Sequence, residues 1–511
     1  MFPPIKERLK KNTLTTILFF MVSVPLLFVI TPMILKYVGK EVYGIWAMVW
    51  AILVFFEFIG LQAPSAMSVL IPKYDPDTQA KEINEIANTV FVFFLFMALL
   101  TAGIFTLGKG WLLNAFFKVT PNLVATADFA LSFCVYAYLI NFVILSFAYV
   151  LGGFNLFYIN NIIKIGALLI RTGLMIFALI KGWGIQGIVI VQMATILLET
   201  VAIIIWGKAV YKPLQFNPLS FNFKRLSQIL RMSVKFMVSR VAQLVNGNID
   251  KIALGFFLTP VTVAYYQIGS NISKYISNVP EMFSSGSIVP AASELSSRGE
   301  KDKFLKYYER INKYIFAVAF FLLGGMVVFG REFILLWLGP GYEQVYTIMV
   351  VLAAVYTVGI AGNTATYALN GFERFKEVML VSGVAAVINV LLSVGLSKYY
   401  GLKGALTGTA ISVVSAAVVT YYIFRKISGY GIGIIQVFVK PFFAVLLTGV
   451  GFFLFEKYLP SGGWGIFIIK GFVFTILFAV LDILVFRHFD AYDFSMLKEN
   501  FGKKPKTDIK E

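Results

Sequence analysis

The sequence predicts an all-α polytopic membrane protein, from its composition and from the length of its apolar runs. Hydrophobic residues make up 59% of the 511 residues and charged residues only 14%, whereas a soluble globular chain carries about 25% charged residues. Runs of about 20 apolar residues, enough for a transmembrane helix, recur from Leu14 to Phe486. No polar stretch between them is long enough for a separate soluble domain, so any chemistry must occur in or beside the bilayer.

Breaks at glycine, proline and charged residues divide these runs into fourteen predicted transmembrane helices. The first begins after a basic segment that ends at Lys11, and Pro25 and Pro32 predict a kink within it. The predicted spans are 13–35, 42–63, 86–108, 123–150, 157–180, 184–207, 228–257, 262–289, 313–338, 345–370, 377–398, 402–424, 438–458 and 465–487.

An internal repeat groups the helices into two halves. Three segments of the first half return in the second half at offsets of 217 to 220 residues: YVLGGFNLF from Tyr149 as YALNGFERF from Tyr367, GIQG from Gly184 as GLKG from Gly401, and VYGIW from Val42 as TVAYY from Thr262. Six helices then precede the point where the pattern restarts. Because six is an even number of crossings, the two halves should enter the membrane with the same orientation and be related by an axis along the membrane normal.

The repeat predicts two parallel six-helix lobes around a central cavity. Residues 1–210 form the first lobe and residues 211–427 the second. Residues 428–490 hold the last two helices, and residues 491–511 form a cytoplasmic tail. Two bundles that face each other enclose a cleft, which is the architecture of alternating-access transporters rather than of a typical membrane enzyme.

The basic residues predict the topology. Lys and Arg are concentrated in the N-terminal segment, in the alternate loops on the same side as that segment, and in the tail. By the positive-inside rule this places both termini in the cytoplasm of a multi-pass protein of the inner (plasma) membrane. The same rule accounts for much of the net charge of +18, so nucleic acid is not an expected partner. The apolar run after Lys11 is too long for a signal peptide, and we expect no cleaved signal.

Polar residues at helical spacing mark the faces that should line the cleft. They are Asn160, Lys164 and Arg171 in 157–180; Gln192 and Glu199 in 184–207; Arg240, Gln243, Asn246 and Asp250 in 228–257; Gln267, Ser270, Asn271, Lys274, Ser277, Asn278 and Glu281 in 262–289; and Asn363, Thr366, Tyr367 and Asn370 in 345–370. A bare charge at the bilayer centre costs at least about 2.5–3.5 kcal/mol, so each of these charges is either functional or part of a structural pair.

Depth in the membrane separates the two interpretations. Lys164 and Glu199 lie at similar depths on adjacent helices, which predicts an ion pair. Arg171, Arg240 and Lys274 lie nearest the midplane, and we expect no carboxylate at their depth. A cavity with such a centre suits an anion, and arginine binds phosphate in a bidentate manner. A structural role for the three cations is equally compatible with the pattern.

Several other activities are excluded or disfavoured. One cysteine, Cys134, allows no intrachain disulfide, and one histidine, His488, allows no histidine-based metal cluster. Asp75-Pro76-Asp77 has the D-x-D spacing of metal-using glycosyltransferases, but no nucleotide-binding domain surrounds it, and chance explains it best. No Ser/His/Asp arrangement or glycine-rich phosphate loop is visible. We therefore expect no enzyme activity, no cofactor and no metal.

Certain motifs resemble the polysaccharide-exporting branch of the multidrug/oligosaccharidyl-lipid/polysaccharide exporter superfamily. They are Gly39-Lys-Glu-Val-Tyr-Gly44, Phe58-Ile-Gly60-Leu, Asn248-Ile-Asp250-Lys-Ile-Ala-Leu-Gly255, Tyr265 and the two Gly-Phe repeat motifs. The resemblance spans nearly the whole chain, although each motif is loose. It departs from the family at Glu57, where aspartate is usual, and at Leu258-Thr259, where Leu-Gly is common.

The resemblance implies a flippase that moves undecaprenyl-diphosphate-linked oligosaccharides, such as O-antigen, capsule or exopolysaccharide units, from the inner to the outer leaflet. Its members use a cationic central cavity. The diphosphate would then be bound by Arg171, Arg240, Lys274 and Lys164. The sugars would be bound by the polar stripe of Gln243, Asn246, Gln267, Asn271, Asn278, Asn363 and Tyr367. Glu57, Glu199 and Asp250 are candidate sites for a coupling ion.

Three alternatives stay open at this point. Lipid II flippases also have fourteen helices, so that substrate is possible. A multidrug or cation antiporter of the same fold should have a carboxylate-dominated midplane and usually twelve helices. A membrane glycan polymerase or transferase would need a larger external loop than the sequence offers. The expected partners are the lipid-linked glycan, membrane lipids and, for a polysaccharide exporter, the polymerase and chain-length proteins.

Overall fold

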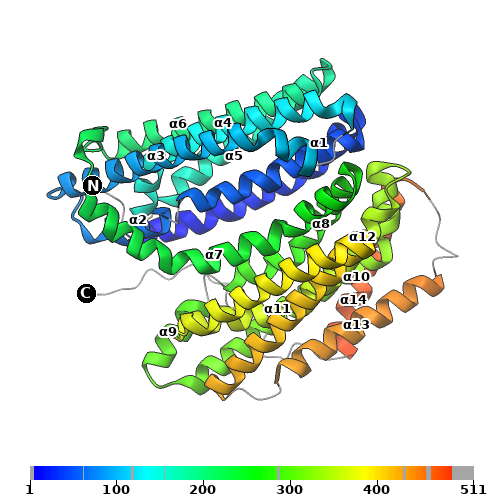
Figure 1. Ribbon diagram of the computed structural model, residues 1–511. Helices are drawn as coiled ribbons and strands as arrows, with labels where there is room; N and C mark the ends of the chain where they lie inside the picture. The colour runs from blue at the N-terminus through cyan, green and yellow to red at the C-terminus, as the bar shows by residue number, and fades with distance from the viewer. Residues whose placement is uncertain are drawn as a thin grey trace. The chain divides into compact units, whose positions relative to one another are not determined.

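The fold is all-α throughout the part of the chain that the computed structural model describes (Figure 1). The described residues are 5–60, 63–116, 120–154, 156–284, 288–429, 433–455 and 462–485. They contain helices joined by short turns and no β-strand. The fold class predicted from composition, an all-α polytopic membrane protein, is confirmed.

The chain divides into two compact units, each of which is described on its own. The first unit comprises Met1–Gln267 and Ala386–Gly408, and the second comprises Ile268–Ala385 and Thr409–Glu511. These units differ from the predicted lobes, because the first unit extends to Gln267 and also takes in a middle segment of a long helix, Ala386–Gly408. The lobe boundaries at residues 210 and 427 stay a prediction.

The longer helices of the first part of the chain lie side by side in Figure 1. Helix α5 packs against α1 and α6, and α4 packs against α3 and α6. The bounds are α1 Ile5–Phe55, α2 Ala63–Leu70, α3 Ala80–Trp111, α4 Val124–Gly153, α5 Phe157–Ile180, α6 Gly184–Val210 and α7 Phe223–Phe257.

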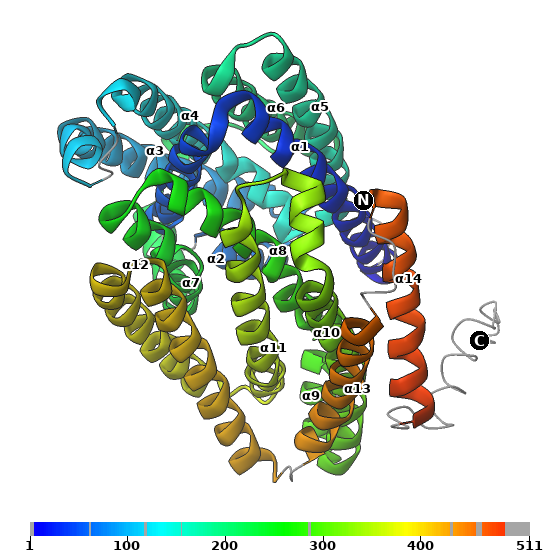
Figure 2. The same cartoon turned by 90° about the vertical axis from the view of Figure 1, so that its right-hand side faces the viewer.

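In the second part of the chain, α10 lies at the centre of a group of helices. It packs against α9, α11, α13 and α14, as Figure 2 shows from the side. The bounds are α8 Pro260–Ser284, α9 Ile288–Ser297, α10 Lys301–Leu338, α11 Glu343–Gly371, α12 Phe375–Ser428, α13 Gly433–Phe455 and α14 Trp464–Val480.

Two helices are too long for one crossing and are interrupted by glycine. A straight helix of 51 residues, the length of α1, would extend about 77 Å, more than twice the roughly 30 Å of the hydrocarbon core. Gly39 in α1 and Gly401 in the 54-residue α12 adopt φ of +84° and +58°. Because only glycine adopts these angles without strain, each of them divides its helix into two.

Ten helices among the described residues are long and apolar enough to cross a membrane. Two of the ten are α1 and α12, each of which contains two predicted spans. Helices α7 and α8 are not among the ten, because their polar faces lower their mean hydropathy. A total of fourteen crossings is compatible with these numbers, but it stays a prediction.

The junctions marked by the sequence repeat recur in the structure. Helix α4 ends at Gly153 and α5 begins at Phe157, and in the same way α11 ends at Gly371 and α12 begins at Phe375. Gly184, which begins α6, has φ of +56°, close to that of its repeat partner Gly401. The sequence analysis missed the short helices α2 and α9, which occupy comparable places before α3 and α10. A hydropathy window is too long to resolve helices of 8 and 10 residues.

Polar residues fix the connection between α6 and α7 to helix α3. Asn84 donates to the Pro213 carbonyl (2.7 Å) and accepts from the Gln215 amide (2.8 Å). One turn later, Asn88 donates to the Gln215 carbonyl (2.9 Å) and accepts from the Asn217 amide (2.8 Å). The two side chains therefore satisfy extended backbone as a neighbouring strand would, and the connection is held in place.

Aromatic packing and one ion pair hold the second unit together. Tyr308 of α10 is fully buried, lies 4.7 Å from the Phe424 ring (centroid to centroid) and shares a 3.0 Å hydrogen bond with Thr364 of α11. Lys470 of α14, with a side chain only 9% exposed, donates to both carboxylate oxygens of Glu332 on α10 (3.1 and 3.2 Å). This pair fastens α14 to α10 without leaving a bare charge in an apolar helix.

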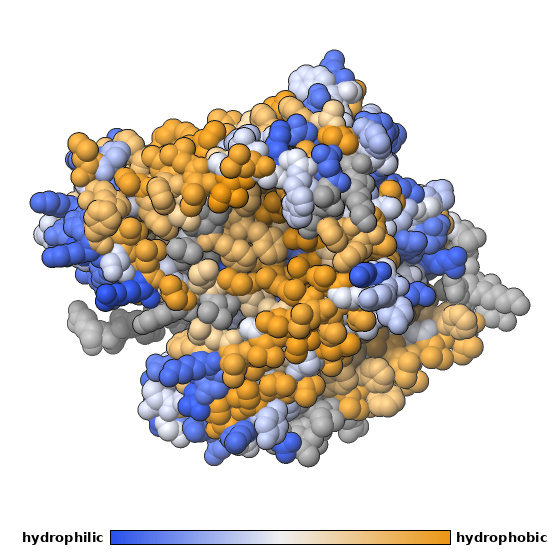
Figure 3. Space-filling model, in the orientation of Figure 1, coloured by the Kyte–Doolittle hydropathy of each residue, from blue (hydrophilic) through white to orange (hydrophobic). Residues whose placement is uncertain are grey.

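The surface matches a membrane environment. In Figure 3 apolar residues cover the sides of the helices in each unit, and polar residues gather at the helix ends. Helix α3, for example, exposes 66% of Leu99, 65% of Ile104 and 90% of Leu107. Contiguous exposure of large apolar side chains along a helix would be unfavourable in water but is favourable in lipid.

We expect Asn88→Ala to weaken the connection between α6 and α7. The change removes two hydrogen bonds, one to the Gln215 carbonyl and one from the Asn217 amide, each worth about 0.5–1.5 kcal/mol. Thermal unfolding of the purified protein in detergent, together with limited proteolysis between residues 211 and 222, measures the effect. Asn114→Ala, at an exposed position after the other end of α3, is the matched control; equal stability of the two variants would contradict the role of Asn88.

Candidate functional site

A polar cavity of about 550 Å³ lies within the first unit. Its lining comes from the segment around α2, from α4 and from α7, and consists of Gly60, Pro64, Ser65, Tyr138, Asn141, Phe142, Leu145, Tyr149 and Arg240. Among these residues Arg240 is the one charged side chain. The cavity therefore combines a guanidinium with hydroxyl and amide groups inside a bundle of membrane helices.

Helix α4 supplies the polar wall of this cavity through its periodicity. Tyr138, Asn141, Leu145 and Tyr149 are spaced so that they share one face of the helix. Asn141 is 7% exposed, and its side-chain oxygen accepts a 2.6 Å hydrogen bond from Thr200 of α6. That bond fixes the orientation of the amide, so its NH₂ group is directed away from Thr200.

Two features shape the cavity next to Arg240. Gly60 comes so close to Phe142 that a Cβ there would lie 3.0 Å from the ring. The Phe142 ring stacks in turn on Phe94 of α3, with centroids 4.1 Å apart. Arg240 itself is half-buried near the middle of α7. The apolar wall and the partial burial lower the local dielectric, which strengthens the attraction of a guanidinium for an anion.

The structure corrects the predicted pairing of Arg171. Its Nη2 lies 3.1 Å from the Glu199 carboxylate, and its Nε donates to Thr195 at 2.9 Å. The prediction that Glu199 pairs with Lys164 is wrong, as is the expectation that no carboxylate lies at the depth of Arg171. Lys164 is exposed. Lys164 and Arg171 share a face of α5 but lie about 10 Å apart along its axis, so the height of α5 against α6 selects Arg171.

Two predicted residues of α7 have structural partners in the first unit. Asn246 accepts a 3.1 Å hydrogen bond from Asn389 of α12. Asp250 is 3% exposed and accepts a 2.6 Å hydrogen bond from the Tyr266 hydroxyl. Gln243, by contrast, is exposed. The predicted polar sector of α7 is therefore divided between packing positions and accessible positions.

The remaining predicted residues lie on α8 and α11 or outside the described side chains. Gln267, Asn271, Lys274 and Asn278 are half-buried on α8. On α11, Asn363 is exposed and Tyr367 is half-buried. The Glu57 side chain lies outside the described part of the chain. A shared cavity for Arg171, Arg240 and Lys274, and the substrate and coupling-ion roles of the predicted residues, stay predictions.

Three of the motifs that carry the family resemblance meet in one cluster. Gly44 of α1 packs so closely on the Pro260 carbonyl that any Cβ there would overlap it. Lys40 donates to the Tyr265 hydroxyl at 3.2 Å. With the bond between Tyr266 and Asp250, these contacts join α1 to the turn between α7 and α8. These motif residues therefore connect helices of the first unit.

Sequence reasoning missed Tyr138, Asn141, Tyr149 and Ser65 as cavity residues. The helical spacing of Tyr138, Asn141 and Tyr149 is a usable signal, but their flanks are so apolar that no polar stripe stands out. Ser65 lies on a helix that the sequence analysis did not resolve. Among the described residues, no group of three or more His, Cys, Asp or Glu side chains is placed to hold a metal ion.

Comparison with known proteins places the chain in context. Residues 9–296, more than half of the chain, match a family described as "polysaccharide biosynthesis protein". An uncharacterized membrane protein of Bacillus subtilis, EpsK, is 22% identical over 428 residues, which cover 80% of this chain and 82% of EpsK.

Solved structures share the fold. A lipid II flippase, MurJ, in an inward closed conformation superposes with a TM-score of 0.72 at 15% identity, and the match covers 92% of this chain and 99% of MurJ. A multidrug resistance MATE family transporter of the MOP superfamily, in an inward-facing conformation, gives 0.59 at 15% identity, with 79% of this chain and 98% of the transporter covered. At these identities the comparison shows that the chain shares the fold of these structures and nothing beyond it.

A double-mutant cycle should reveal the pair between Arg171 and Glu199. Both side chains are about one-sixth exposed (16% and 17%), so removal of one charge leaves the other poorly solvated. Arg171→Gln and Glu199→Gln should each cost about 1–3 kcal/mol, and the double variant less than the sum of both. Thermal unfolding in detergent measures the coupling; strictly additive losses would show that the two charges do not interact.

Proposed function

The chain belongs to the polysaccharide biosynthesis protein family, and from this premise we propose that it is a flippase for lipid-linked oligosaccharides. The substrate in this proposal is an undecaprenyl-diphosphate-linked repeat unit of O-antigen, capsule or exopolysaccharide. The protein moves it from the inner to the outer leaflet of the plasma membrane by alternating access, with both chain termini in the cytoplasm.

The cavity around Arg240 carries this proposal. Its volume of about 550 Å³ lies within the usual range for small-molecule sites, roughly 300–1,000 Å³. A guanidinium binds a phosphate through two parallel hydrogen bonds, and Tyr138, Asn141, Tyr149 and Ser65 offer the hydroxyl and amide groups that sugars require. A polar anion that carries sugars satisfies both halves of this lining.

Other predicted residues belong to the proposal without being assigned to this cavity. They are Lys274 and the predicted polar residues of α8 and α11, which we propose bind the diphosphate and the sugars. Arg171 is paired with Glu199. In this proposal an approaching diphosphate competes with the Glu199 carboxylate for the Arg171 guanidinium. The polyprenyl chain stays among lipid tails, because transfer of its apolar surface into a polar cavity is unfavourable.

The cavity disfavours the cation antiporter as an alternative. Arg240 is the charged side chain among the described lining residues, and a guanidinium attracts an anion and repels a cation. A lipid II flippase would use the same diphosphate chemistry, so the sugar attached to the lipid distinguishes the two substrates. Candidate partners beyond the substrate are the polymerase and chain-length proteins of the same polysaccharide.

We expect Arg240→Ala to abolish flipping while leaving membrane insertion intact. The substitution removes the charge that offsets desolvation of the diphosphate, whereas Arg240→Lys keeps the charge, loses the bidentate geometry and should retain a small part of the rate. A leaflet-resolved assay in vesicles measures the rate with an undecaprenyl-diphosphate oligosaccharide and, in parallel, with lipid II.

Two controls make this assay specific. Arg231→Ala removes an exposed arginine of the same helix and should flip at the wild-type rate. Asn141→Asp keeps the size of the side chain but adds a negative charge to the cavity, so it should slow an anionic substrate. Wild-type flipping by Arg240→Ala would refute the site, and a rate with lipid II above that of the oligosaccharide would refute the proposed substrate.

Flipping should depend on membrane potential. Outward movement of the diphosphate, from a negative interior, is favoured by roughly 2.3 kcal/mol per charge per 100 mV. A secondary possibility is a proton or sodium ion bound at Glu57, Glu199 or Asp250 during the return step. Potassium-diffusion potentials of either sign, imposed on the same vesicles, should accelerate or slow flipping; a rate that does not change with potential or ion gradients would leave the substrate gradient as the driving force.

A further inference from the structure

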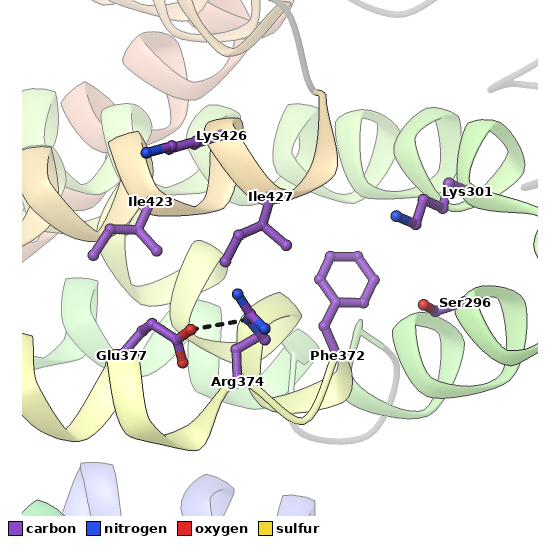
Figure 4. Close-up of a pocket in the computed structure, with 8 residues that line it drawn as sticks. All are labelled: Ser296, Lys301, Phe372, Arg374, Glu377, Ile423, Lys426 and Ile427. Atoms are coloured by element: carbon purple, nitrogen blue, oxygen red, sulfur yellow. Dashed lines mark ion pairs between the residues drawn. The ribbon is translucent and has the colours of Figure 1, made fainter.

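A second pocket, of about 640 Å³, lies within the second unit. Figure 4 shows that its basic side chains come from different helices: Lys301 begins α10, Arg374 precedes α12 and Lys426 lies near the end of α12. Ser296 adds a hydroxyl and Glu377 the one acidic group among the described lining residues. The lining therefore carries an excess of two positive charges.

The position of Arg374 leaves part of its guanidinium available for a ligand. Its Nε lies 3.0 Å from a carboxylate oxygen of Glu377, and the side chain is 49% exposed. The two terminal Nη groups are on the other edge of the guanidinium, where they match the spacing of two phosphate oxygens. The turn that places Arg374 is unusual, because Glu373 adopts φ of +60°, a conformation that costs a non-glycine residue about 1–2 kcal/mol.

Part of the pocket wall is apolar. Phe372, Ile423 and Ile427 line it beside the basic residues. Next to Ile423 on α12, Val419 and Tyr422 expose 45% and 64% of their surface. A free phosphate would gain nothing from this wall, whereas a phospholipid would place its phosphate among the cations and its glycerol and upper acyl carbons along the isoleucines.

We propose that this pocket binds the phosphate of an anionic phospholipid headgroup. Its lining segments belong to the loops that the positive-inside rule assigns to the cytoplasmic side, where anionic lipids attract basic residues. The site is separate from the cavity around Arg240, since the two share no residue. The inference does not rest on the proposed flippase activity, because lipid binding is measurable without transport.

Native mass spectrometry of the purified full-length protein, titrated with phosphatidylglycerol or phosphatidylcholine, tests the proposal. Wild-type protein should hold phosphatidylglycerol more tightly than phosphatidylcholine, and Arg374→Gln/Lys426→Gln should weaken phosphatidylglycerol binding about tenfold. Lys306→Gln/Lys376→Gln removes the same charge from exposed positions outside the pocket and should bind as the wild type does. Glu377→Gln should tighten binding, a gain that misfolding cannot imitate.

The possible outcomes are distinct. If both double variants bind phosphatidylglycerol equally weakly, the loss reflects the net charge of the protein and not this pocket, and the proposed site is overturned. Equal affinity for the two lipids would overturn the choice of an anionic headgroup. Inorganic phosphate, added at millimolar concentration, should leave phosphatidylglycerol bound; if it displaces the lipid, the apolar wall contributes nothing and the lipid assignment fails.

Discussion

A polar group that a membrane helix carries away from water must find its partner within the protein, and this constraint accounts for much of the structure. Helix formation satisfies the backbone. The charges are handled by pairing: Arg171 with Glu199, and Lys470 with Glu332. In each pair the two helices are held at a fixed rotation and height. An unpaired charge would be unfavourable in lipid. Once paired, the charges give specific contacts to helix surfaces that are otherwise uniformly apolar.

The repeat reuses one set of helix junctions twice. Gly184 and Gly401, at matching positions, both adopt positive φ, so each marks the point where one helical segment ends and the next begins. The junctions after Gly153 and Gly371 match as well. Yet the side chains near these junctions differ, since Arg374 and Glu377 pair at the start of α12, and their counterparts at offset 218, Leu156 and Ile159, are apolar. The two halves therefore share positions of helix ends but differ in the chemistry beside them.

The two basic sites, one in each unit, have linings of similar chemistry. In both, an arginine lies beside a wall of aromatic or aliphatic side chains, and hydroxyl groups complete the lining. Such a wall reduces the competition of water for the guanidinium, and an anionic group that brings apolar or sugar moieties with it gains on both sides. The two linings differ in charge: Arg374 shares its pocket with Lys301, Lys426 and Glu377, whereas Arg240 is the one charged side chain among the described residues that line its cavity.

The sequence by itself determined the membrane class, the approximate positions of the long helices and the family, because these depend on composition, apolar run length and local motifs. It also singled out Arg240, which lines the cavity of the first unit; its position at the midplane stays a prediction. Only the tertiary structure decided that Glu199 binds Arg171 rather than Lys164, that Asn141 and two tyrosines of α4 join Arg240 around one cavity, and that Arg374, Lys301 and Lys426 converge. Periodicity gives the face of a helix on which a residue lies, but not the rotation and height of that helix against its neighbours. Those quantities come from packing between segments that are distant in the chain.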